Sequence, residues 1–258
     1  MAKKTEKRQK KPAIKQVKSD ELDEKPKRKI QIRLVGTSHI AKQSVDEVKH
    51  NLETFKPDVV AIELDSRRLQ AMLSKDVQQK VPFWLIFKIG VVGYIFAKLG
   101  SWGSKKLGKL VGVEPGEEMM TAVKLAKQNN LKLALIDQPI EITLARFSRK
   151  ITFREKMRFI KDIFRSLLFR KTMEKELGID LNQFDLTKVP SNELIKQLVK
   201  VMKNKYPNAY SVLVDERNHV MATNLMKIAK QHDKILAVVG AGHLEGMKED
   251  LDRILKQR

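Results

Sequence analysis

The sequence contains no cysteine among its 258 residues and only five histidines. The lack of cysteine excludes disulfides, thiolate zinc sites and a cysteine nucleophile, so any bound metal must have nitrogen and oxygen ligands. Acidic residues are scarce as well, because 31 Asp and Glu accompany 52 Lys and Arg and leave a net charge of +21. This excess indicates an anionic partner, either nucleic acid or an acidic membrane surface, unless it reflects a generally Lys-rich proteome.

No helix-turn-helix, RNA-recognition or zinc-finger pattern accompanies the positive charge, so nucleic-acid binding is disfavoured. A secretory signal is also absent from the start of the sequence. We therefore expect a cytoplasmic protein, with peripheral attachment to an anionic membrane surface as the alternative.

Residues 1–29 contain twelve basic and five acidic side chains and almost no apolar ones. This composition predicts a disordered basic arm, which either contacts an anionic partner or serves as a solubilising tail. The remaining residues, 30–258, are numerous enough to bury a substantial core, and we expect them to form one domain.

Four apolar, β-branched runs have the pattern of buried parallel strands: residues 30–35, 58–64, 131–136 and 234–239. Helical patterns lie between them, over residues 42–55, 115–129, 140–176, 191–202 and 208–231. The alternation predicts an α/β fold with a parallel-rich central sheet flanked by helices. Helical insertions at about 81–112 and 140–204 predict an inserted helical subdomain.

The two insertions have distinct character. Residues 81–103 are the most apolar stretch, but Lys88, Lys98 and four glycines interrupt it. We expect a helix pair packed on the domain or lying in a membrane interface, rather than a membrane-spanning helix. Residues 146–175 contain eleven basic side chains beside an apolar stripe, a pattern that suits either an anionic surface or an ordinary solvated helix face.

Two segments share one pattern, Gly36-Thr37-Ser38-His39 and Gly240-Ala241-Gly242-His243, and each follows a predicted strand. A strand that ends in Gly-x-x-His leaves an imidazole at the carboxyl end of the sheet, where open α/β folds bind ligands. Two imidazoles that converge on one cleft form a candidate metal or acid–base site.

Carboxylates follow the other strands, at Glu63, Asp65 and Asp137. Glu63 comes directly after an apolar run, so we expect it to be buried and to need a cation partner or a metal. Asp65 is expected to cap the next helix. On the 208–231 helix, Glu216 and Arg217 fall on or beside the apolar stripe, and we favour their facing the same rim over a purely structural pairing.

The sequence resembles the TraB/PrgY family, and more broadly the superfamily of Tiki proteases, erythromycin esterases and ChaN-like proteins. The matching stretches are residues 36–39, 57–65 with Arg68, 115–119, 136–146, 215–218 and 238–243. The resemblance covers about residues 30–255 and implies an α/β fold with a metal-dependent, peptidase-like centre. Tiki proteins act as manganese- or cobalt-dependent proteases, whereas TraB and PrgY limit active peptide pheromone.

The resemblance also assigns roles to individual residues. His39 and His243 match the two family histidines, Glu63 and Glu216 match its acidic positions, and Arg217 matches its arginine. The family usually has arginine after the aspartate of the third strand, where this sequence has glutamine at position 138.

The leading hypothesis is a metal-dependent hydrolase that acts on a peptide or protein. His39, Glu63 and His243 would bind a divalent ion, for which the resemblance favours manganese or cobalt and the ligand types also allow zinc. Glu216 would be a further ligand or the general base, and Arg217 would steady a substrate carboxylate or the developing oxyanion. The alternative is a non-enzymatic regulator or scaffold that binds peptide or associates with a membrane surface.

Overall fold

The computed structural model describes residues 29–37, 42–74, 83–111, 116–168 and 192–257, so residues 1–28 of the predicted N-terminal arm and His39 lie outside it. Four parallel strands form its sheet: β1 (Gln31–Thr37), β2 (Val59–Ile62), β3 (Lys132–Leu135) and β4 (Lys234–Gly240). Their order across the sheet is β1-β4-β2-β3. The predicted α/β class and all four predicted strands are confirmed.

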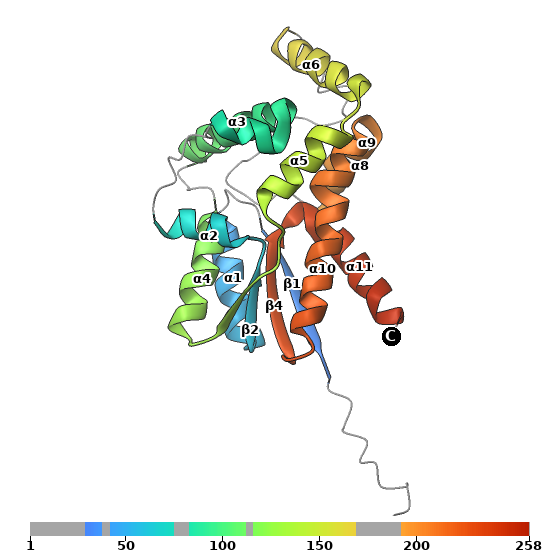
Figure 1. Ribbon diagram of the computed structural model, residues 1–258. Coiled ribbons are helices and arrows are strands. Elements are labelled where there is room, and N and C mark those ends of the chain that lie inside the picture. Colours follow the sequence, from blue (N-terminus) through green and yellow to red (C-terminus); the bar gives the residue numbers. More distant parts are fainter. Residues whose placement is uncertain (1–28, 38–41, 75–82, 112–115, 169–191, 258) are drawn as a thin grey trace, which may run out of the picture.

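Helices cover both faces of this sheet (Figure 1). On one face lie α1 (Lys42–Phe55) and α4 (Glu117–Gln128), and on the other lie α10 (Glu216–Ile228) and α11 (Leu244–Lys256). The chain moves in one direction from β1 through β2 to β3 and then returns to β4, so right-handed crossovers place α1 and α4 on one face and α10 on the other, where α11 joins it after β4. The connections that leave the adjacent strands β1 and β4 therefore diverge at their carboxyl ends, where such sheets have a crevice.

Alternating side chains of the central strands fill the two cores. Ala61 and Val239 pack in the core shared with Leu225, on the α10 side, whereas Val60 and Val238 belong to the core on the α1 side. The central strands are thus buried on both faces, as their continuous apolar runs predict.

A layer of further helices lies beyond the carboxyl ends of the strands (Figure 1). It contains a short 3₁₀ turn, η1 (Phe83–Leu85), with α3 (Ile86–Val111), α5 (Ile140–Lys150), α6 (Phe153–Leu168), α8 (Asn192–Lys205) and α9 (Pro207–Tyr210). Phe147, Ile151, Ala209 and Val212 form its own apolar core. The two stretches predicted as insertions supply this outer helical layer.

The expectation of one long helix over 140–176 is wrong. The backbone of Ile151 is extended, and Thr152 begins a new helix through reciprocal bonds with Glu155. The Glu155 carboxylate accepts the Thr152 N–H at 3.1 Å, and the Thr152 hydroxyl accepts the Glu155 N–H at 3.3 Å, which is a capping box. Residues 169–176 of the expected helix lie outside the described part of the chain.

The predicted helix pair in the apolar stretch is present, because α3 contains a break at Gly90. Gly90 has φ +75°, and a β-carbon there would lie 2.4 Å from the Ser148 hydroxyl, so only glycine allows α3 to pack this closely on α5. Among the described residues, no helix combines the length and apolar character needed to cross a bilayer.

Candidate functional site

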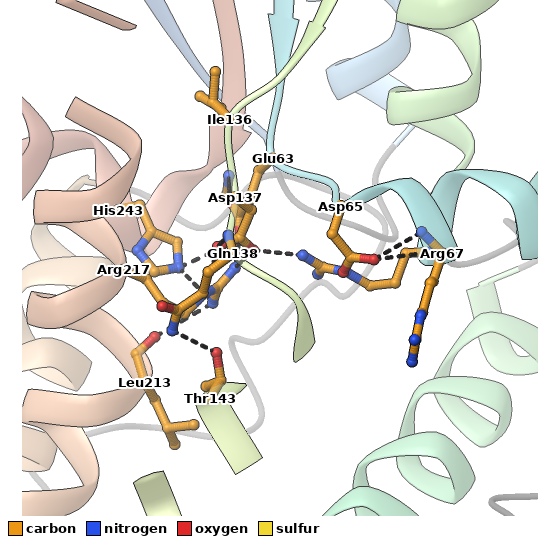
Figure 2. A network of polar contacts seen from close by, with 12 residues as sticks. Glu63, Asp65, Arg67, Ile136, Asp137, Gln138, Thr143, Leu213, Arg217 and His243 are labelled. Carbon is orange, nitrogen blue, oxygen red and sulfur yellow. Dashed lines mark hydrogen bonds and ion pairs between the residues drawn. The ribbon is translucent and has the colours of Figure 1, made fainter. Parts of the chain in front are cut away.

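Acidic, basic and imidazole side chains from four segments meet at the carboxyl edge of the sheet (Figure 2). They form the rim cluster: Glu63, Asp65, Arg68, Asp137, Arg217 and His243. Glu63 follows β2, Asp137 lies just beyond β3, and His243 ends the turn after β4. The carboxyl ends of parallel strands therefore bring these groups to one edge, as the strand pattern predicts.

Arg217 lies at the centre of the rim cluster and is only 13% exposed. Its Nη2 donates to the carboxylate of Glu63 and, at 2.6 Å, to Oδ2 of Asp137. Burial lowers the pKa of Arg217, but the two carboxylates outweigh this effect and raise the pKa above its ordinary value. The guanidinium is therefore a permanent cation that neutralises buried carboxylates.

A turn of π-helix, η3 (Ser211–Asp215), precedes α10 and widens the backbone just before Arg217. The Leu213 carbonyl accepts a bond from Arg217 Nη1 at 3.3 Å. Further along α10, the Asn224 amide donates to the carbonyl of Ile136, the residue before Asp137, at 2.9 Å. Helix α10 is thus fixed to the end of β3, which places Arg217 beside Asp137.

Arg68 links the rim cluster to helix α2 (Ser66–Leu73). Its Nε donates to Asp65 at 2.6 Å and its Nη2 donates to Asp137. Asp65 also caps α2, accepting the backbone N–H groups of Arg67 and Arg68, so the predicted cap is confirmed. Burial raises the pKa of Asp65, but its bonds to Arg68 outweigh burial and hold the pKa below its ordinary value.

The contacts of His243 define its tautomer. Its Nε2 lies 3.0 Å from Nη1 of Arg217, which can only donate, so Nε2 accepts. Its Nδ1 lies 2.7 Å from the Asn218 carbonyl oxygen and therefore carries the proton. A β-carbon on Gly246 would lie 2.2 Å from the Asn218 amide nitrogen, so the glycine in α11 leaves the space that Asn218 occupies.

Glu63 connects this imidazole to the turn that carries it. Its Oε2 accepts the backbone N–H of Gly240 at 2.6 Å, and its Oε1 lies 3.4 Å from Nε2 of His243. Among the described members of the rim cluster, three carboxylates face two guanidiniums and a neutral imidazole. They therefore have an excess of one negative charge, which favours a further cation at this edge.

Glu216 points to a different partner, although it is adjacent to Arg217. Its carboxylate accepts bonds from Arg146 at 2.5 Å and Lys150 at 2.7 Å, both on α5. Burial raises the pKa of Glu216, but Arg146 and Lys150 outweigh burial and lower the pKa below its ordinary value. The structure thus brings Glu63, Arg217 and His243 together and separates Glu216 from them.

A pocket of about 640 Å³ is connected to the rim cluster through Asn218, the partner of His243, but its described lining contains no member of the cluster. Asn218, Glu216, Arg146 and Gln138 contribute to its lining. Gln138, which donates to the Thr143 hydroxyl at 2.8 Å, is part of the pocket wall. Within the described ranges, no group of three or more His, Cys, Asp or Glu side chains is arranged to hold a metal ion.

The sequence predicts Asp137 at the rim but assigns it no role, and it assigns none to Arg68 or Asn218. Asp137 was expected at the rim, but its two guanidinium partners come from distant parts of the sequence. The sequence did contain an indication for Asn218, because it lies three residues before Met221 in the apolar stripe. The structure shows that it is almost completely buried. A buried amide on such a stripe needs a hydrogen-bond partner, which here is His243.

The fold and its site define an α/β protein with a buried charge cluster at the carboxyl rim of a parallel sheet. The chain belongs to the TraB/PrgY/gumN family, whose model matches residues 24–257. It is 36% identical over 225 residues to an uncharacterized protein of Methanocaldococcus jannaschii, covering 86% of this chain and 54% of that protein. It is 23% identical over 244 residues to the human TraB domain-containing protein, covering 85% of this chain and 62% of that protein. The chain thus spans little more than half the length of these relatives.

Proposed function

We propose that this protein is a metal-dependent hydrolase whose reacting centre is the rim cluster. The observation that carries the proposal is the inward-facing Nε2 of His243, 3.4 Å from the Glu63 carboxylate in a cluster with excess negative charge. An unprotonated imidazole nitrogen beside a buried carboxylate is a suitable donor pair for a divalent ion.

The donor set fits such an ion in kind, and in number when His39 is included. Glu63 and His243 supply two donors, and the matching Gly-x-x-His sequence supplies His39, which lies outside the described residues. Manganese, cobalt and zinc all accept imidazole and carboxylate ligands. Such an ion would polarise a carbonyl group and lower the pKa of a bound water.

The protein's own groups contribute binding and orientation. Arg217 is fixed by Asp137, and its guanidinium can donate hydrogen bonds to a substrate oxygen that gains negative charge. Asn218 keeps the proton on Nδ1 of His243, so Nε2 is the acceptor atom on the side of Arg217 and Glu63. Glu216 acts as an anchor between α10 and α5 in the pocket wall, because its carboxylate is already bound by two cations.

The adjacent pocket suits a peptide or protein segment as substrate. Its volume of about 640 Å³ lies within the usual range for ligand sites. Arg146 and Arg253 line it together with Asp215 and Glu249, so it presents both signs of charge. Peptide bonds flanked by polar side chains can form hydrogen bonds and ion pairs with such a wall.

Metal content and hydrolysis test the proposal. The protein, His39→Ala, His243→Ala and Glu216→Gln would be loaded with manganese, desalted and measured by elemental analysis. We expect about one equivalent in the parent protein and Glu216→Gln, and a large loss in both histidine variants. Equal metal content in all four would contradict the ligand assignment.

Cleavage of a quenched fluorescent peptide library would then be measured with the loaded protein and with Arg217→Lys. We expect the lysine variant to retain metal but lose most activity, because a single ammonium cannot reproduce the guanidinium geometry. Stoichiometric metal without any cleavage would instead favour the regulator that binds peptide without hydrolysing it.

A further inference from the structure

One face of η1 and α3 is apolar and lacks cover from the described residues. This α3 face consists of Phe83, Trp84, Phe87, Val91 and Ile95, which are all between 51% and 86% exposed. Trp84 and Phe87 lie three residues apart before the break at Gly90, and Val91 and Ile95 lie four residues apart after it, so the two members of each pair share one side of their own segment. The opposite side packs on α5, where Ile89 is buried and Gly93 lies against the Leu144 backbone.

The charge around this face has one sign. The sequence contains no Asp or Glu from residue 77 to residue 113. Lys88 and Lys98 are exposed on α3, beside the apolar side chains. Helices that lie in the headgroup region of a membrane typically have aromatic and aliphatic side chains flanked by lysine.

Helix α6 adds a second surface of the same kind in the outer helical layer (Figure 1). Phe153, Met157 and Ile160 are exposed at a spacing of four and three residues. Arg154 and Lys161 are exposed on the same helix. The layer beyond the carboxyl ends of the strands thus presents apolar side chains with basic neighbours on two of its helices.

We propose that the α3 face inserts into the headgroup region of an anionic membrane. The alternative occupant, a second copy of this chain, would bring two acid-free faces of a protein with net charge +21 together. Anionic lipid instead complements Lys88 and Lys98 and accepts the exposed rings at the same time. The inference does not depend on metal binding or hydrolysis at the rim cluster.

Trp84 provides a direct reporter, because the sequence has only two tryptophans and Trp102→Phe leaves Trp84 alone. The full-length variant would be mixed with vesicles of phosphatidylcholine containing one third phosphatidylglycerol, and with pure phosphatidylcholine vesicles. We expect a blue shift of Trp84 emission and quenching by acyl-brominated lipid with the anionic vesicles, both weaker at high salt. Vesicle binding without these changes would assign attachment to another surface, such as the basic N-terminal arm, and would overturn the proposal.

A double substitution, Phe87→Ser with Val91→Ser, tests the face itself, and Leu255→Ser on α11 is the matched control because Leu255 is also about half exposed. We expect the double variant to bind anionic vesicles at least about tenfold more weakly in flotation, and the control to bind like the parent. Equal binding by all three would overturn the proposal. So would sedimentation that shows a dimer in the parent and a monomer in the double variant without lipid, since the occupant would then be a second copy.

Discussion

The rim cluster and the α3 face invert the usual distribution of polar and apolar groups in opposite ways. In the rim cluster, three carboxylates and an imidazole are almost completely buried, whereas on the α3 face five large apolar side chains are exposed. Buried charges are costly unless they are paired, and exposed apolar patches are rare on proteins that do not bind there. We therefore expect the stability of the fold to depend on the ion pairs of the rim cluster, whereas the α3 face should matter for binding and little for stability.

Removing the central cation should have the largest effect on folding. Arg217→Met leaves Glu63 and Asp137 buried without their shared partner, and we expect the free energy of unfolding to fall by about 3–5 kcal/mol. Urea unfolding followed by circular dichroism measures this loss. Arg217→Lys keeps the charge and should lose less, while a loss below about 1 kcal/mol in Arg217→Met would show that other groups neutralise the two carboxylates.

Removing the hydrogen-bond acceptor of the His243 imidazole should lower the free energy of unfolding by less than Arg217→Met does. Asn218→Leu leaves the buried Nδ1–H of His243 without the amide oxygen, and we expect a loss of about 1–3 kcal/mol. Nitrogen-15 NMR of the imidazole should also report a shift away from the Nδ1–H tautomer. Asn218→Asp keeps an oxygen acceptor and should retain that tautomer, so an unchanged tautomer in Asn218→Leu would show that Asn218 does not set it.

The sheet and half of the site were predictable because both follow from local patterns. Apolar β-branched runs identify the strands, and the residue that ends each run identifies Glu63, Asp137 and His243 as neighbours at one edge. The break between α5 and α6 was missed because apolar residues continue at helical spacing across it. Its signal was nevertheless present, since Thr152 and Glu155 have the spacing of a capping box.

The rest of the site depends on contacts between distant segments. Successive helical residues point about 100° apart, so Glu216 and Arg217 meet different neighbours, and the apolar stripe alone did not show which of them contacts the rim. The ion-pair partners determine the orientation of each side chain. Arg217 pairs with Asp137, whereas Glu216 pairs with Arg146 and Lys150 of α5. The second guanidinium partner of Asp137 is Arg68, which is 69 residues away in the sequence, so no local pattern indicates this pair.

Asp65 lies at the edge of the rim cluster, and its contribution to the free energy of unfolding should be smaller and should depend on pH. The pKa of Asp65 is lowered in the folded protein, so its contribution is present above the unfolded value and is lost as the pH falls through the folded pKa. Asp65→Asn can still cap α2 but loses the ion pair with Arg68. We expect a loss of about 1 kcal/mol at neutral pH that shrinks toward zero under strongly acidic conditions. Urea unfolding of both proteins across the acid range measures this, and a constant difference at all pH values would contradict it.

The α3 face should show the smallest effect on stability and so completes the contrast with the rim cluster. Phe87 is 86% exposed, so Phe87→Ser removes few contacts within the fold. We expect the free energy of unfolding to change by no more than about 0.5 kcal/mol, measured by urea unfolding without lipid. Ile89→Ser, two residues away on the buried side, should destabilise the protein by several-fold more, because it places a hydroxyl in the contact between α3 and α5. A loss in Phe87→Ser as large as that in Ile89→Ser would mean that the chain itself covers Phe87, and the face would then be part of the core rather than a surface for lipid.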